Sequence, residues 1–75
     1  MGISKEFLRD QMKKLETNYG KDRFLINQEM FDLWYEVFSD CEAEGLKLAV
    51  INCMKDCEYA PNIAKLMKCY KELSI

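Results

Sequence analysis

The sequence predicts an all-α fold, a compact four-helix domain. Three observations support this fold class. Apolar residues recur at three- and four-residue intervals in four segments, N-capping side chains precede these segments, and the 75-residue chain contains only one proline and three glycines. The helices are expected over about residues 5–18, 28–39, 42–56 and 63–73. Hydrophobic residues make up 49% of the chain, which is ordinary globular composition, and we expect residues 1–75 to form a single domain.

The first two expected helices have clear boundary signals. Ser4 is placed to cap the first helix and Gly20 to end it, while Asn27 is placed to cap the second. The second helix is apolar over about two-thirds of its circumference, so it is either central to the bundle or carries a second face for a partner. We expect Trp34 to lie in the core. The apolar residues of this helix are Met30, Phe31, Leu33, Trp34, Tyr35, Val37 and Phe38.

The third and fourth helices meet at a corner. Ser39 or Asp40 is expected to cap the third helix, and Gly45 weakens its first turn. Pro61 cannot continue a helix and Asn62 is a good N-cap, so one helix ends and the next begins there. The inward faces are predicted to be Leu46, Ala49, Val50, Cys53, Met54 and Cys57 on the third helix and Ile63, Leu66, Met67 and Tyr70 on the fourth, with Leu48 facing away.

Charge is distributed unevenly along the chain. The net charge is −2, yet residues 24–46 carry six acidic side chains and no basic one. These are Glu29, Asp32, Glu36, Asp40, Glu42 and Glu44. Two interpretations are open: complementarity within the fold together with helix-dipole preference, or an acidic docking face for a basic partner.

The composition argues against an enzyme. The chain has no histidine, which is the commonest general base and metal ligand, and its isolated glycines form no phosphate-binding loop. We therefore expect no catalytic site, no cofactor and no metal site. The longest apolar run, residues 48–51, is far too short to span a membrane, and the N-terminus lacks a signal peptide, so we expect a cytoplasmic protein.

The four cysteines, Cys41, Cys53, Cys57 and Cys69, are expected to be reduced thiols in the core. Disulfides or a thiolate metal site remain the alternatives.

The last helix carries a basic stripe of Lys65, Lys68 and Lys71. With the preceding corner, this stripe loosely resembles a helix-turn-helix, so a small nucleic-acid-binding module is an alternative function. The acidic overall charge and the lack of Arg, Asn and Gln on this helix argue against that interpretation.

Two sequence features carry a family resemblance. One is the helix containing Leu33-Trp34-Tyr35, and the other is the corner Tyr59-Ala60-Pro61-Asn62-Ile63-Ala64. Their order and spacing resemble the phage-encoded replicative helicase loader and inhibitor family of Gram-positive phages and prophages, over about residues 4–72. In that family the corner typically reads aromatic, Pro, Pro, Thr, Ile, Ala. Here Ala60 and Asn62 replace the first Pro and the Thr but keep an extended residue and a cap.

The resemblance implies a non-enzymatic protein that binds a replicative helicase or its loader in the bacterial host cell, with at most indirect contact to DNA. An uncharacterised prophage interaction domain is the other interpretation, and a homodimer is also open. In the family a flexible tail follows the helical region and makes much of the helicase contact, whereas this sequence stops at Ile75, which leaves open whether a tail is missing. If the folded domain binds, we expect the outer side of the second helix to do so, through Phe31, Tyr35, Asp32 and Glu36.

Overall fold

The computed structural model describes residues 2–73, and these residues form four helices. The helices are α1 (Lys5–Tyr19), α2 (Gln28–Phe38), α3 (Ala43–Asp56) and α4 (Ile63–Leu73). The described part of the chain contains no strand, and it measures 32 × 26 × 17 Å with a radius of gyration of 11.3 Å. The all-α fold class is confirmed, and every helix begins and ends within one residue of its expected boundary.

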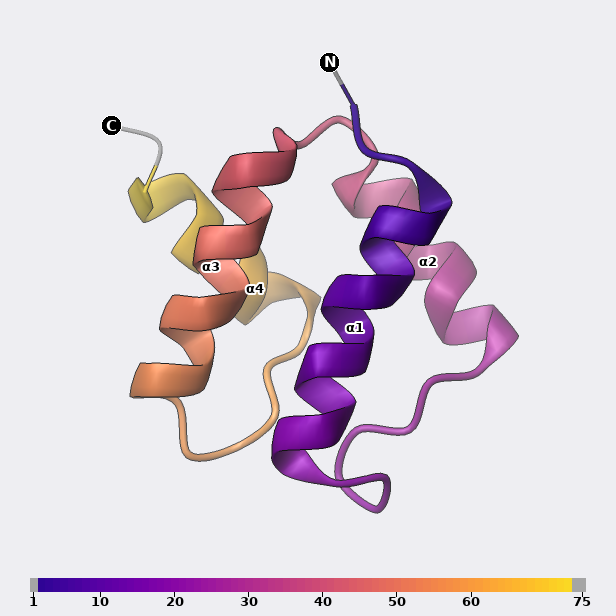
Figure 1. Ribbon diagram of the computed structural model, residues 1–75, viewed down its shortest axis with the longest axis vertical. Helices are drawn as coiled ribbons and strands as arrows, with labels where there is room; N and C mark the ends of the chain where they lie inside the picture. The colour runs from indigo at the N-terminus through magenta and orange to yellow at the C-terminus, as the bar shows by residue number, and fades with distance from the viewer. Residues whose placement is uncertain (1, 74–75) are drawn as a thin grey trace.

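Figure 1 shows α1 in front, with α2 on one side of it and α3 on the other. The fourth helix lies against α3, and these two form the most extensively packed pair. Helix α1 contacts both α3 and α2, and α2 also contacts α4. The chain segment between α1 and α2 and the corner between α3 and α4 therefore lie near opposite sides of the same core, beside α2.

Three predicted caps form as expected. The side chain of Ser4 accepts a hydrogen bond from the Phe7 N–H at 3.0 Å, and Asn27 accepts one from the Met30 N–H at 2.8 Å. Asn62 accepts one from the Lys65 N–H at 2.9 Å, so it caps α4 as predicted. Gly20 ends α1 with a φ of 92°, a conformation that favours glycine over other residues.

The start of α3 differs from the prediction. The N-cap is Glu42, and its side chain makes no capping hydrogen bond. Ser39 instead continues the last turn of α2 in αR geometry. The hydroxyl of Tyr70 on α4 accepts a hydrogen bond from the Glu42 N–H at 2.9 Å. A donor at the start of α3 is thus satisfied by a side chain 28 residues away rather than by a neighbouring Ser or Asp.

The core is built mainly from the inward faces predicted for the helices. Trp34 is buried, as expected, and its ring lies 5.5 Å from the rings of both Phe24 and Phe38. Leu48 faces away from the core and is 45% exposed. The buried apolar residues are Ile3, Leu8, Met12, Leu15, Phe24, Phe31, Trp34, Phe38, Cys41, Leu46, Ala49, Val50, Cys53 and Leu66. No helix in the described range 2–73 has the length and apolar character needed to cross a membrane.

Candidate interaction surface

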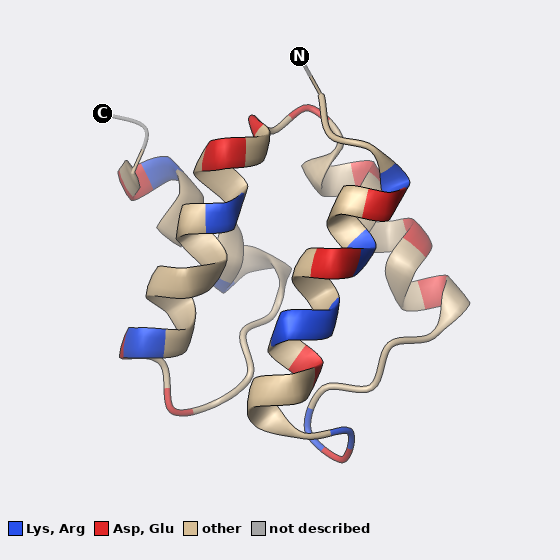
Figure 2. Ribbon diagram, in the orientation of Figure 1, with Lys and Arg blue, Asp and Glu red and all other residues tan. Residues whose placement is uncertain are grey.

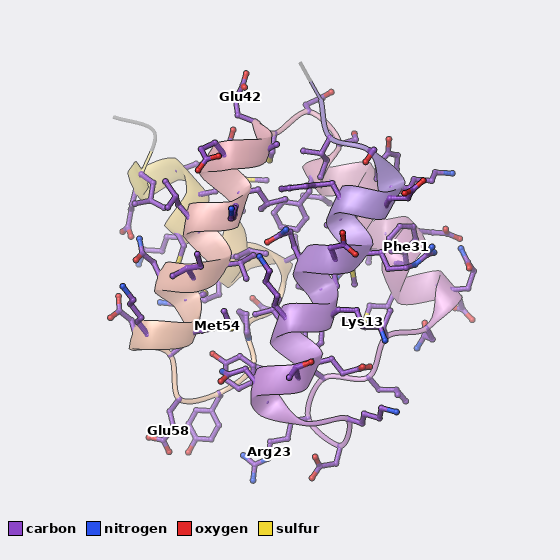
Figure 3. The ribbon with its side chains drawn as sticks, in the orientation of Figure 1. Lys13, Arg23, Phe31, Glu42, Met54 and Glu58 are labelled. Atoms are coloured by element: carbon purple, nitrogen blue, oxygen red, sulfur yellow. The ribbon has the colours of Figure 1, made fainter. Side chains whose placement is uncertain are left out.

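The expected outer face of α2 is partly covered. Phe31 is only 3% exposed, so the prediction that it lies on the outer side is wrong. Figure 3 shows Phe31 on the side of α2 that lies beside α1. The Arg9 guanidinium of α1 lies 4.5 Å from the centroid of its ring, and the Tyr35 ring stacks against it with a centroid distance of 6.3 Å. Phe31 is therefore part of the α1–α2 contact.

Tyr35 is half-buried and connects α2 to the N-terminal segment. Its hydroxyl donates a hydrogen bond to the Ile3 carbonyl at 3.2 Å, and the Lys5 ammonium lies 5.6 Å from its ring centroid. Arginine and lysine commonly lay their apolar stems over aromatic surface while the charge stays in water. The α1 cations thus cover the two aromatic rings that the sequence had suggested as anchors.

The two carboxylates of the predicted site are exposed. Asp32 and Glu36 lie four residues apart on α2, which places them one above the other on the helix surface. Asp32 accepts a hydrogen bond from the Gln28 side-chain amide at 2.7 Å. The structure therefore brings all four predicted residues onto adjoining positions of α2, but it exposes the acidic pair and not the aromatic pair. Partner binding by these four residues stays a prediction.

Two other apolar residues of α2 face solvent. Leu33 is 53% exposed and Val37 is 37% exposed. With the half-buried Met30 they form what we call the α2 patch: Met30, Leu33 and Val37. Sequence reasoning counted these residues as apolar but did not place them at the surface. The signal was their spacing, because Leu33 follows the exposed Glu29 by four positions and precedes Glu36 by three.

A groove lies beside the α2 patch, between α2 and the Pro61 corner. It has a volume of about 530 Å³, within the range of about 300–1,000 Å³ that is typical of binding clefts. Met30 belongs to both the α2 patch and this groove, so the two surfaces are continuous. Leu25, at 60% exposed, also borders the groove. We call it the corner groove, and it is lined by Arg23, Phe24, Leu25, Met30, Trp34, Ala60, Pro61, Asn62, Ile63 and Ala64.

The lysines of the alternative nucleic-acid site lie on α4. Lys65, Lys68 and Lys71 are all exposed. Lys68 and Lys71 border a hollow that also includes Met67 and the acidic Glu72. Nothing in the geometry around these lysines selects a nucleic acid, and their role in binding one stays a prediction.

Three of the cysteines form a thiol cluster between α3 and α4. The sulfur of Cys53 lies 3.9 Å from that of Cys57 and 3.5 Å from that of Cys69. All four cysteines are free thiols, so the predicted disulfide alternative is not formed. Burial raises the pKa of the Cys53 thiol, and hydrogen bonds to Cys69 and Cys57 raise it further. Within residues 2–73, no group of three or more His, Cys, Asp or Glu side chains is arranged to hold a metal ion.

Residues 6–67 match the family model for the N-terminal domain of a phage helicase loader and inhibitor. The chain belongs to this family. The resemblance inferred from the Trp34 helix and the Pro61 corner is therefore confirmed. The match runs from α1 into α4 and includes the α2 patch and all the residues that line the corner groove. No curated protein and no solved structure matches the chain significantly.

Proposed function

We propose that this protein is a non-enzymatic phage or prophage regulator of DNA replication that binds a replicative helicase or its loader. Membership of the phage helicase loader and inhibitor family over residues 6–67 is the observation that carries this proposal. The protein would act in the cytoplasm of the bacterial host, and its effect on DNA would be indirect, through the bound helicase or loader.

We further propose that the exposed side of α2 takes part in this binding. Asp32 and Glu36 are exposed there, and Leu33 and Val37 lie beside them. An apolar centre with a charged rim is the usual anatomy of a protein interface. Phe31 and Tyr35 support this surface from beneath by fixing α2 to α1 and to the N-terminal segment.

A pull-down with a bacterial replicative helicase and with its loader tests the proposal. We expect the wild-type protein to capture one of them, and the double variant Asp32→Lys, Glu36→Lys to capture less. The matched control is Glu6→Lys, Asp10→Lys, which reverses two exposed carboxylates that also lie four residues apart, but on α1. Capture of neither protein by the wild type would contradict the proposed function.

The same experiment separates the alternative function. Binding of labelled DNA that weakens with salt, and that is lost in the triple variant Lys65→Glu, Lys68→Glu, Lys71→Glu, would support a nucleic-acid-binding module instead. The proposed function predicts that this triple variant still captures the helicase or loader.

A further inference from the structure

The exposed apolar surface of α2 is too continuous to be a set of isolated side chains. Leu33 and Val37 lie four residues apart on one row of the helix, and Met30 precedes them by three and seven positions. Met30 then continues into the corner groove, whose rim carries the exposed Leu25. A contiguous exposed apolar surface of this kind usually marks a contact with another molecule.

Carboxylates border this surface on one side. Glu29, Asp32 and Glu36 follow one another at three- and four-residue spacing and are all exposed, so they form an acidic row along α2. No basic side chain occurs between residues 24 and 46. Figure 2 shows that the charged positions of α2 are all acidic. A partner lying on the α2 patch would therefore be favoured by basic side chains on the edge that faces this row.

The shape of the surface favours a helix over an extended strand. Strand addition needs an unpaired sheet edge, and residues 2–73 contain no strand. Met30 and Val37 are seven residues apart, which corresponds to about 10.5 Å along α2. A partner helix with apolar residues at i, i+3 or i+4, and i+7 presents its anchors over the same length, and one further apolar side chain can enter the corner groove.

We propose that the α2 patch and the corner groove receive an amphipathic helix of a partner protein, with lysine or arginine side chains along the edge that faces Glu29, Asp32 and Glu36. This inference rests on the proposed function, because it states which kind of segment the helicase or loader would present. It makes Leu33 and Val37 the apolar contacts at the centre and the acidic row the part that selects the partner by charge.

Binding of synthetic peptides tests the inference without a helicase. The probes are three labelled peptides of about 18 residues, long enough to form a helix. The first has leucines at i, i+3, i+4 and i+7 spacing flanked by lysines, the second has glutamates in place of the lysines, and the third has the first composition in scrambled order. Fluorescence polarisation measures affinity, and the emission of Trp34, the only tryptophan, reports occupation of the corner groove.

We expect the lysine peptide to bind and to shift the Trp34 emission. The double variant Leu33→Asp, Val37→Asp should bind at least about tenfold more weakly, as expected when central interface contacts are lost. Leu48→Asp is the matched control, because Leu48 is similarly exposed but lies on α3. Affinity should also fall between about 50 and about 300 mM salt. Far-UV circular dichroism checks that each variant remains folded.

Equal binding of the lysine, glutamate and scrambled peptides would overturn the inference, and so would unchanged affinity in the Leu33→Asp, Val37→Asp variant. A concentration-dependent dimer that this variant abolishes would also overturn it, since a second copy would then cover the surface. Full capture of helicase or loader by the same double variant would refute the inference and leave the proposed function standing. Capture of neither protein by the wild type, with peptide binding intact, would refute the proposed function alone.

Discussion

The contact between Gly45 and Tyr70 predicts that one substitution will change sign with its background. A Cβ atom at position 45 would lie 2.8 Å from Cε1 of Tyr70, and its three nearest atoms all belong to the Tyr70 ring. The ring cannot move freely, because its hydroxyl accepts a hydrogen bond from the Glu42 N–H. Gly45→Ala therefore requires the ring to shift and that hydrogen bond to weaken.

The opposing contributions can be estimated. Alanine in place of glycine inside a helix stabilises by about 0.5–1 kcal/mol. Loss of the hydrogen bond costs about 1 kcal/mol, and crowding a packed site costs about 1–3 kcal/mol. We expect Gly45→Ala to lower the free energy of unfolding by about 1–2 kcal/mol in the wild type. In a Tyr70→Ala background the ring is absent, so the same substitution should raise it by about 0.5–1 kcal/mol.

Urea unfolding of the wild type, both single variants and the double variant measures this coupling. Far-UV circular dichroism and Trp34 fluorescence should give coincident transitions for a two-state domain, and equal m-values would show that the unfolded states are comparable. The expected difference between the two backgrounds is about 2 kcal/mol. If Gly45→Ala has the same effect in both, within the additivity error of about 0.3–0.5 kcal/mol, the ring does not limit position 45 and the reasoning fails.

Three further predictions concern the core and its titrating groups. Leu46→Ala should destabilise by about 3 kcal/mol, whereas Leu48→Ala on the exposed side of the same helix should cost less than about 0.5 kcal/mol; thermal unfolding compares them, and equal costs would contradict the assigned orientation of α3. Tyr19→Phe should cost about 1 kcal/mol, because the Tyr19 hydroxyl donates to the Cys57 carbonyl at 2.8 Å, and a neutral result in urea unfolding would show that this bond contributes nothing. Burial raises the pKa of Cys53, so its contribution to stability is complete below the ordinary thiol pKa near 8.5 and is lost above it, by at most about 1.4 kcal/mol per pH unit; unfolding under reducing conditions at about pH 7 and about pH 10 should show this loss, and Cys53→Ala should reduce it.

Local signals predicted most of the fold. The caps at Ser4, Asn27 and Asn62 and the stop at Gly20 depend on residues three or four positions away, so the sequence contains the whole cause. The inward faces followed from helical spacing alone. The start of α3 was not predictable in this way, because its backbone donor is satisfied by Tyr70 from a distant part of the chain.

The candidate site shows the same limit. Helical spacing could place Phe31 and Tyr35 near the acidic row, but it could not show that Arg9 and Lys5 of another helix would cover their rings. The exposure of Leu33 and Val37 depends equally on what the other helices leave uncovered. The corner groove required three segments to be placed in space, although the Pro61 corner that forms one wall was evident from the sequence.

That corner also determines how rigid the groove is. Pro61 is buried and its ring fixes its own φ, Asn62 holds the next turn through its capping hydrogen bond, and Trp34 on the opposite wall packs against Phe24 and Phe38. Walls held in this way lose little conformational freedom when a ligand enters. More of the interaction energy then remains as affinity, so the corner groove is preorganised for whatever side chain it receives.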